Sequence, residues 1–145
     1  MLLRNGKNFL AVRNSGNVNF QIKDYTGDTQ NEYLPNAAYS SIHVGSNNTA
    51  PTTSDYSITT VSGLTLVNNS ASYNNGTSWG ADYLASFSST YKNNTNQDIE
   101  VNEYGVCYYD TYRDGFWHYY FTRDVLDEPK VIHPGESYTF SVTMG

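Results

Sequence analysis

Three histidines, one cysteine and a group of acidic residues are the side chains of this 145-residue chain that could take part in chemistry. His43, His118 and His133 stand apart from one another, and the chain has neither a His-Glu-x-x-His nor a Cys-x-x-Cys metal motif. Cys107 is the only cysteine, so it can form no disulfide within the chain. The sequence therefore predicts no metal site and no cofactor.

The acidic residues could in principle supply the carboxylate pair of a glycoside hydrolase. They are Asp110, Asp114, Asp124, Asp127 and Glu128. Their spacing predicts no such pair, whereas carboxylates at these positions are typical of turns and strand ends. We therefore predict that the protein is not an enzyme.

Seven aromatic residues surround Asp114-Gly115, a dipeptide that favours the two-residue type I′ turn of a β-hairpin. They are Tyr108, Tyr109, Tyr112, Phe116, Trp117, Tyr119 and Tyr120. Because successive residues of a strand point to opposite faces, the core cannot take up all seven side chains. We interpret them as candidate interface aromatics for a protein partner. The alternative is a carbohydrate-binding or host-receptor-binding module in which Trp117 and nearby tyrosines stack on a host glycan.

The strand before this hairpin changes the face that it presents. Ile99 and Val101 share one face, but the next bulky pair, Tyr104 and Val106, has the opposite parity. A strand that changes parity without ending needs one extra residue, and Gly105 is suited to host such a bulge.

Glu103 and Arg123 are the two charged residues that the hairpin could bring together. If the strands pair about the turn so that facing positions sum to 229, Glu103 lies opposite Leu126 and Arg123 lies opposite Val106. The bulge, or a diagonal position, then brings the two charges within reach. No nucleophile or metal ligand accompanies them, so we predict a structural pair that fixes the register.

Composition limits the partners of the protein. The net charge is −6 with a pI near 4.8, and the 8 Lys and Arg residues are scattered, so a nucleic-acid-binding surface is not expected. No apolar run approaches the roughly 18 residues that cross a membrane, and the N-terminus has no signal-peptide pattern. The single thiol is typical of a protein made in a reducing cytoplasm.

Alternating apolar residues predict strands at 18–22, 39–44, 58–67, 83–91, 99–109 and 137–143. Polar loops are expected at 45–57 and 68–80, and Pro129 is expected to break the chain at 127–129. Residues 1–16 show no helical periodicity, so we expect an extended N-terminal arm that becomes ordered only against a neighbouring subunit. Residues 17–145 are expected to form an all-β domain, a single antiparallel β-sandwich of jelly-roll or immunoglobulin-like type.

Two stretches resemble the small virion structural proteins of tailed bacteriophages and prophages. Residues 40–58 (SSIHVGSNNTAPTTSDYSI) are similar to the segment hydrophobic-x-V/L-G-x-G-x-T-x-P-x-x-x-D-x-x-L of those proteins. Residues 99–106 (IEVNEYGV), 121–126 (FTRDVL) and 131–140 (VIHPGESYTF) are similar to their ending, I-x-I-x-E-x-G-L, hydrophobic-x-R-x-x-L and V-x-x-G-x-x-hydrophobic-x-hydrophobic. The chain departs from the pattern at Asn47, where a glycine is usual, and at Tyr104.

The resemblance implies a non-enzymatic β-sandwich that is built into the phage particle in many copies. Its partners would be other virion proteins of the capsid, neck or tail and further copies of itself. It would be made in the host bacterial cytoplasm and end in the virion. The resemblance leaves the location within the particle open.

Overall fold

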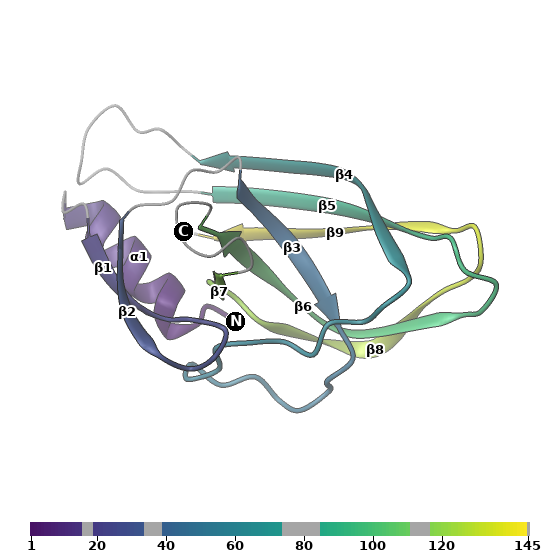
Figure 1. Cartoon of the computed structure of the whole chain (residues 1–145), viewed down its shortest axis with the longest axis horizontal. Coiled ribbons are helices and arrows are strands. Elements are labelled where there is room, and N and C mark those ends of the chain that lie inside the picture. Colours follow the sequence, from purple (N-terminus) through teal and green to yellow (C-terminus); the bar gives the residue numbers. More distant parts are fainter. Residues whose placement is uncertain (16–18, 34–38, 74–84, 111–116, 145) are drawn as a thin grey trace.

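A computed structural model describes the chain except for residues 16–18, 34–38, 74–84, 111–116 and 145. The predicted type I′ turn at Asp114-Gly115 lies outside the described residues. Two antiparallel sheets pack on one another along the long axis of the molecule, and a helix with a short hairpin lies at one end (Figure 1).

The first sheet has the order β4-β5-β9, from β4 (Leu64–Tyr73), β5 (Ala85–Asn93) and β9 (Ser137–Met144). The second is built on the long strand β6 (Ile99–Tyr109), which pairs with β3 (Ser40–Gly45), β7 (His118–Tyr120) and β8 (Asp124–Ile132). Strands β1 (Asn19–Lys23) and β2 (Thr29–Tyr33) form a separate hairpin beside helix α1 (Arg4–Ser15).

One hydrophobic core joins these layers. Phe87 and Phe140 reach it from the first sheet, and Ile42, Val106 and Tyr119 reach it from the second. Apolar residues that alternate with polar ones place one face of each sheet in this core. The predicted all-β antiparallel sandwich is confirmed.

The prediction of an extended N-terminal arm is wrong, because residues 4–15 form helix α1. Leu3 and Phe9 are buried, and the ring of Phe9 lies 5.6 Å from that of Phe20 and 5.0 Å from that of Phe121. The helix therefore packs within its own chain, and no neighbouring subunit is needed to order it. The apolar residues that pack here are Leu2 and Leu3, just before the helix, and Phe9 and Leu10, seven positions later. Two pairs are too few to show a clear helical pattern in the sequence.

Several strand limits also differ from the predictions. Strand β4 begins at Leu64 and runs through residues 68–73, where a loop was expected. Its Asn and Ser side chains are tolerated because β4 pairs only with β5 among the described strands and lies largely exposed. Strand β8 continues past Pro129, but its ladder with β6 passes directly from Val125 to Lys130, so the expected break is an interruption of pairing.

The bulge in β6 lies three residues before its predicted place. The register with β8 shifts between Val101 and Glu103, where Asn102 stands opposite the unpaired residues 126–129 of β8. Facing positions sum to 227 with β7, and with β8 they sum to 231 before the shift and to 228 after it, so the predicted sum of 229 is also wrong. Glu103 consequently faces Val125 instead of Leu126.

Candidate functional site

The face of β6 that points away from the core carries a carboxylate, a thiol and a phenol. Glu103, Gly105, Cys107 and Tyr109 alternate on it, while the residues between them, such as Val106, face the core. The segment that follows β3, residues 46–60, lies across this face and hydrogen-bonds to it. A polar face can be buried in this way only if its partners are supplied by the covering segment.

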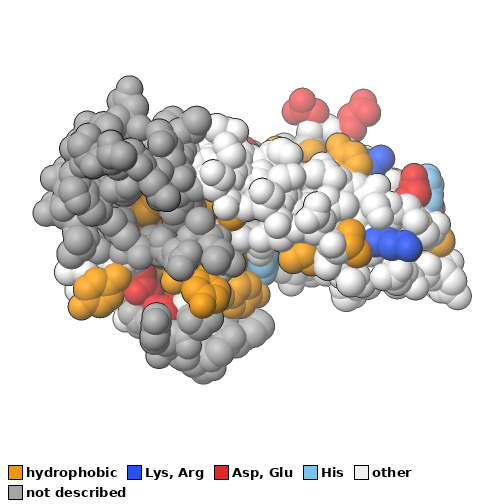
Figure 2. All heavy atoms as spheres, turned by 90° about the horizontal axis from the view of Figure 1, so that it is seen from above, with side chains coloured by type: hydrophobic (Ala, Val, Ile, Leu, Met, Phe, Trp, Pro, Cys, Tyr) orange, Lys and Arg blue, Asp and Glu red, His pale blue; other side chains and the backbone are white. Residues whose placement is uncertain are grey.

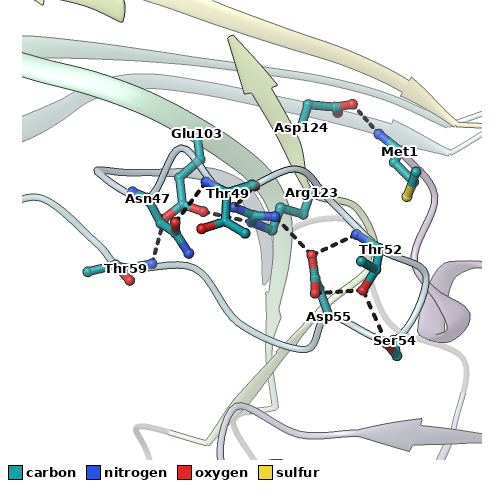
Figure 3. A network of polar contacts seen from close by, with 10 residues as sticks. All are labelled: Met1, Asn47, Thr49, Thr52, Ser54, Asp55, Thr59, Glu103, Arg123 and Asp124. Carbon is teal, nitrogen blue, oxygen red and sulfur yellow. Dashed lines mark hydrogen bonds and ion pairs between the residues drawn. The ribbon is translucent and has the colours of Figure 1, made fainter.

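Arg123 and Glu103 are in direct contact, as the sequence analysis expected. The Arg123 Nε donates a hydrogen bond to Glu103 Oε2 at 2.8 Å, and the two residues are only 2% and 0% exposed. The remaining guanidinium nitrogens are also used: Nη1 donates to Asp55 Oδ2 at 2.9 Å and Nη2 donates to the Thr49 carbonyl oxygen at 2.8 Å (Figure 3). A planar guanidinium with fixed donors is suited to such a three-way contact.

The second oxygen of Glu103 holds the covering segment. Glu103 Oε1 accepts hydrogen bonds from the backbone N–H of Thr59 at 2.6 Å and of Asn47 at 3.2 Å (Figure 3). One buried carboxylate thus connects both ends of residues 46–60 to the arginine. We call these contacts of Glu103, Arg123, Asp55, Thr49, Asn47 and Thr59 the arginine network.

Asp55 remains ionised within this network. Burial by itself would raise the pKa of its carboxyl, but hydrogen bonds from Thr52 and from Arg123 outweigh it, and the net pKa is lowered. The Thr52 hydroxyl donates at 2.8 Å and its backbone N–H at 3.0 Å. Ionised Asp55 therefore supplies a second negative charge beside the buried guanidinium.

The N-terminus lies against the same segment. Leu2 pairs with Thr122 as an isolated bridge, and the Arg123 N–H donates to the Met1 carbonyl oxygen at 3.0 Å. The Met1 amino group contacts the Asp124 carboxylate (Figure 3). The backbone on both sides of Arg123 is therefore fixed.

Two glycines allow the close approach that the network needs. A Cβ atom on Gly45 would collide with Glu103 Oε1 and with the Thr59 carbonyl oxygen. A Cβ atom on Gly105 would collide with the Thr122 carbonyl oxygen. Gly105 is thus required for a backbone contact, and the predicted role as a bulge residue is wrong.

The arrangement is suited to holding structure rather than to turnover. Every charged atom of Glu103 and Arg123 named above is hydrogen-bonded to an internal partner. Burial raises the pKa of the nearby Cys107 thiol well above its usual range, so the thiol is a poor nucleophile. Within the described residues, no group of three or more His, Cys, Asp or Glu side chains is placed to hold a metal ion.

Three of the five candidate interface aromatics that the structure describes lie inside the molecule. Tyr108 and Tyr119 lie in the main core, and Tyr120 is buried with Cys107 and Leu3 in a second cluster on the outer face of β6. These three side chains are too buried to pack against a protein partner, so this part of the prediction is wrong. Alternation does place aromatics on both faces of the sheet around β6. The outer face is buried as well, however, because the N-terminal segment covers it.

The other four members of this set divide evenly. Tyr109 and Trp117 are half-buried, and the Trp117 indole N–H donates to Asp24 at 3.0 Å. Tyr112 and Phe116 lie outside the described residues. The indole N–H is therefore committed to the β1–β2 turn, and glycan stacking on Trp117 stays a prediction.

The sequence did not indicate a second group of rings, which lies on the outer face of β6. His43 and Tyr25, which come from β3 and from the turn after β1, meet Tyr109, His118 and Tyr120 around a hollow. Their positions along the chain share no spacing, so only the pairing of β3 with β6 could have indicated it.

Within the described part of the chain, no helix is long and apolar enough to cross a membrane. Searches of protein-family models, of curated proteins and of solved structures found no match to this chain.

Proposed function

We propose that the protein is a non-enzymatic structural component of a tailed-phage virion, acting in many copies through protein–protein contacts. Its partners are other virion proteins and further copies of the chain, with which it assembles in the host bacterial cytoplasm. The proposal begins from the resemblance of residues 40–58 and 99–140 to that class of proteins.

The observation that carries the proposal is the convergence of the two resembling stretches. Thr49 and Asp55 belong to the first, and Glu103 and Arg123 belong to the second, yet all four meet in the arginine network. Asp55 and Arg123 are 68 positions apart in the chain. Motif residues that are remote in sequence but adjacent in space support a shared structural core, and chance matches in unrelated loops would not be expected to meet.

The network also suits a particle component physically. It pins a long, polar covering segment to the sheet through buried, charge-assisted hydrogen bonds. A rigid surface loses little conformational entropy on docking, which favours assembly.

The exposed apolar side chains offer contact positions different from those expected. Val67 is 51% exposed on β4 with Leu66 beside it, and Tyr33 is 71% exposed on β2. On the described part of the face on the β4 side, uncharged side chains predominate, its Lys and Arg atoms lie toward the end remote from α1, and a few Asp and Glu side chains are also visible (Figure 2). Scattered apolar groups on a surface with few charges are suited to packing against another protein.

Mass spectrometry of density-purified particles would test the proposal. Particles made by cells that carry the gene should contain the protein at a fixed ratio to the major capsid protein, and particles from a deletion strain provide the control. A variant Val67→Asp should fold but be depleted from particles, whereas Lys130→Asp, at a charged position, should be incorporated normally. Absence of the protein from washed wild-type particles would contradict the proposal.

A further inference from the structure

We propose that the hollow lined by Tyr25, His43, Tyr109, His118 and Tyr120 binds a single neutral sugar ring. The hollow measures about 300 Å³ and lies beside the arginine network on the outer face of the second sheet. Small-molecule sites span about 300–1,000 Å³, so there is room for one pyranose ring rather than for a longer glycan. The inference goes beyond the virion role and does not depend on it.

The rings form a continuous wall. Tyr25 stacks on His118 with centroids 4.4 Å apart and planes inclined by 11°. His118 continues to Tyr109 at 5.0 Å, and His43 lies 5.4 Å from Tyr109. Faces of aromatic rings are the surfaces on which the C–H groups of a pyranose can stack.

Among the residues that the structure describes, no Asp, Glu, Lys or Arg lines the hollow. Burial, together with the neighbouring His118, lowers the pKa of His43 to about 4, so this imidazole is neutral at neutral pH. Burial raises the pKa of Tyr109 to about 12 and that of Tyr120 further, so both phenols keep their protons. Such a lining offers hydrogen bonds without attracting an ion.

Polar residues also line the hollow. Ser57 and Thr60 line it from the covering segment, where both are exposed. Tyr120 is buried, and its hydroxyl lies 3.4 Å from His43 Nδ1, a long contact that a ligand hydroxyl could improve on. Aromatic faces combined with neutral hydroxyls match a sugar better than a quaternary ammonium ion, for which a carboxylate would be expected nearby.

The wall formed by the covering segment is fixed before any ligand arrives. Thr59, between the two rim residues, donates its N–H to Glu103 at 2.6 Å, and its carbonyl oxygen accepts from the Ser46 N–H at 2.8 Å. Thr60 pairs with Gly45 as an isolated bridge. Binding therefore requires little reordering of this segment.

Nuclear magnetic resonance titration of the full ¹⁵N-labelled chain would test the inference. The probes are the methyl glycosides of glucose, galactose, mannose and N-acetylglucosamine. At least one should produce saturable shifts at the amides of His43, Ser57, Thr60 and Tyr109. Choline and N-acetyltyrosinamide are the competing probes, and tighter binding of either would overturn the assignment to a sugar.

Matched variants locate the site. Tyr109→Leu should weaken the sugar by about tenfold, whereas Tyr33→Leu, the same change at an exposed tyrosine far from the lining, should alter the dissociation constant by less than about twofold. Thr60→Trp, which fills the hollow from its exposed rim, should abolish binding while the remaining spectrum is retained. Failure of every glycoside to bind, or unchanged binding by Thr60→Trp, would refute the proposal.

Discussion

The outer face of β6 holds two adjacent regions with opposite character. At the Glu103 end, the buried carboxylate of Glu103 is hydrogen-bonded at 2.6–3.2 Å to Arg123, Thr59 and Asn47. At the Tyr109 end, aromatic rings surround an open hollow of about 300 Å³. The same covering segment, residues 46–60, closes the first region and borders the second.

The difference follows from the cost of leaving groups unpaired. A buried carboxylate or guanidinium without a partner is strongly unfavourable, so the arginine network is stable only when it is complete. Aromatic rings carry no such penalty, and planar groups of fixed shape easily leave room between them. The first region is a structural support because its buried charges all have partners. The second region has a hollow between its rings, where a ligand can bind.

Arg123→Ala should have the largest effect, because it leaves Glu103 buried and unpaired and frees Asp55 and Thr49. We expect the free energy of unfolding to fall by about 3–5 kcal/mol in urea denaturation. Arg4→Ala removes an exposed arginine and should change it by less than about 0.5 kcal/mol.

The double variant Glu103→Leu/Arg123→Leu separates the pair from its surroundings. The losses of the two single leucine variants should sum to more than the loss of the double variant, since each single change leaves one charge stranded. Additive losses would show that the two side chains do not stabilise each other. The predicted role of the pair in fixing register stays a prediction until this cycle is measured.

The rings that line the hollow, here called the ring region, should make the free energy of unfolding depend on pH. The pKa of His43 falls from 6.5 to about 4 on folding, so between these values the unfolded chain binds a proton that the folded chain does not. Stability is therefore full above pH 6.5 and declines as the pH falls toward 4, by on the order of 3 kcal/mol in total.

Urea denaturation at a series of pH values would measure this decline, and His43→Gln should flatten the curve in that interval. The variant His118→Gln measures how much the adjacent imidazole contributes to the lowered pKa of His43. The two ring centroids are 6.3 Å apart. His133 provides the control of opposite sign: it is exposed, and the hydrogen bond that its imidazole donates to the Asp98 carboxylate raises its pKa. Its contribution is present at low pH and is lost as the pH rises. An unchanged pH profile in His43→Gln would contradict the description of the ring region.

Gly105→Ala should give an intermediate effect. The new methyl group would meet the carbonyl oxygen of Thr122, the residue directly before Arg123, so the segment between β7 and β8 that carries the arginine must shift. We expect a loss of about 1–3 kcal/mol in the free energy of unfolding. Ser62→Ala, at an exposed position, is the control, and a Gly105→Ala protein as stable as this control would show that the approach is not tight.

The sequence could predict the parts that depend on local patterns. Alternation placed Phe20, Ile22 and the closing strand, and the hairpin brought Glu103 near Arg123 even though its register was wrong by one or two residues. A long glutamate and a long arginine tolerate such an error, because their side chains can reach diagonal neighbours.

The rest depends on contacts that leave no local signal. Thr49 and Asp55 reach Arg123 from a segment without apolar periodicity, and the hydrogen bond from Arg123 Nη2 to Thr49 is to a backbone oxygen that any residue would supply. The ring region requires β3 to pair with β6, since His43 meets Tyr109 only through that pairing. Alternation indicated that aromatics would lie on both faces, but it could not indicate that Leu3 would cover the second one.

The smallest effects should come from two residues of the covering segment: Asp55, which binds Arg123, and Ser57, which lines the hollow. Asp55→Asn keeps the shape of the side chain but weakens its bond to Arg123, so we expect a loss of about 1–2 kcal/mol at neutral pH. The pKa of Asp55 is lowered on folding, so its contribution to stability is present above the ordinary pKa of 3.8 and is lost as the pH falls below that value. The variant Asp55→Asn should remove this acid dependence.

Ser57→Ala trims only the exposed rim of the hollow and should stay within about 0.5 kcal/mol of the wild type. Urea denaturation of both variants, repeated at acid pH, measures the contrast. Equal losses at these two positions would mean that the segment stabilises the fold uniformly, and the division of this face into a closed support and an open site would then fail.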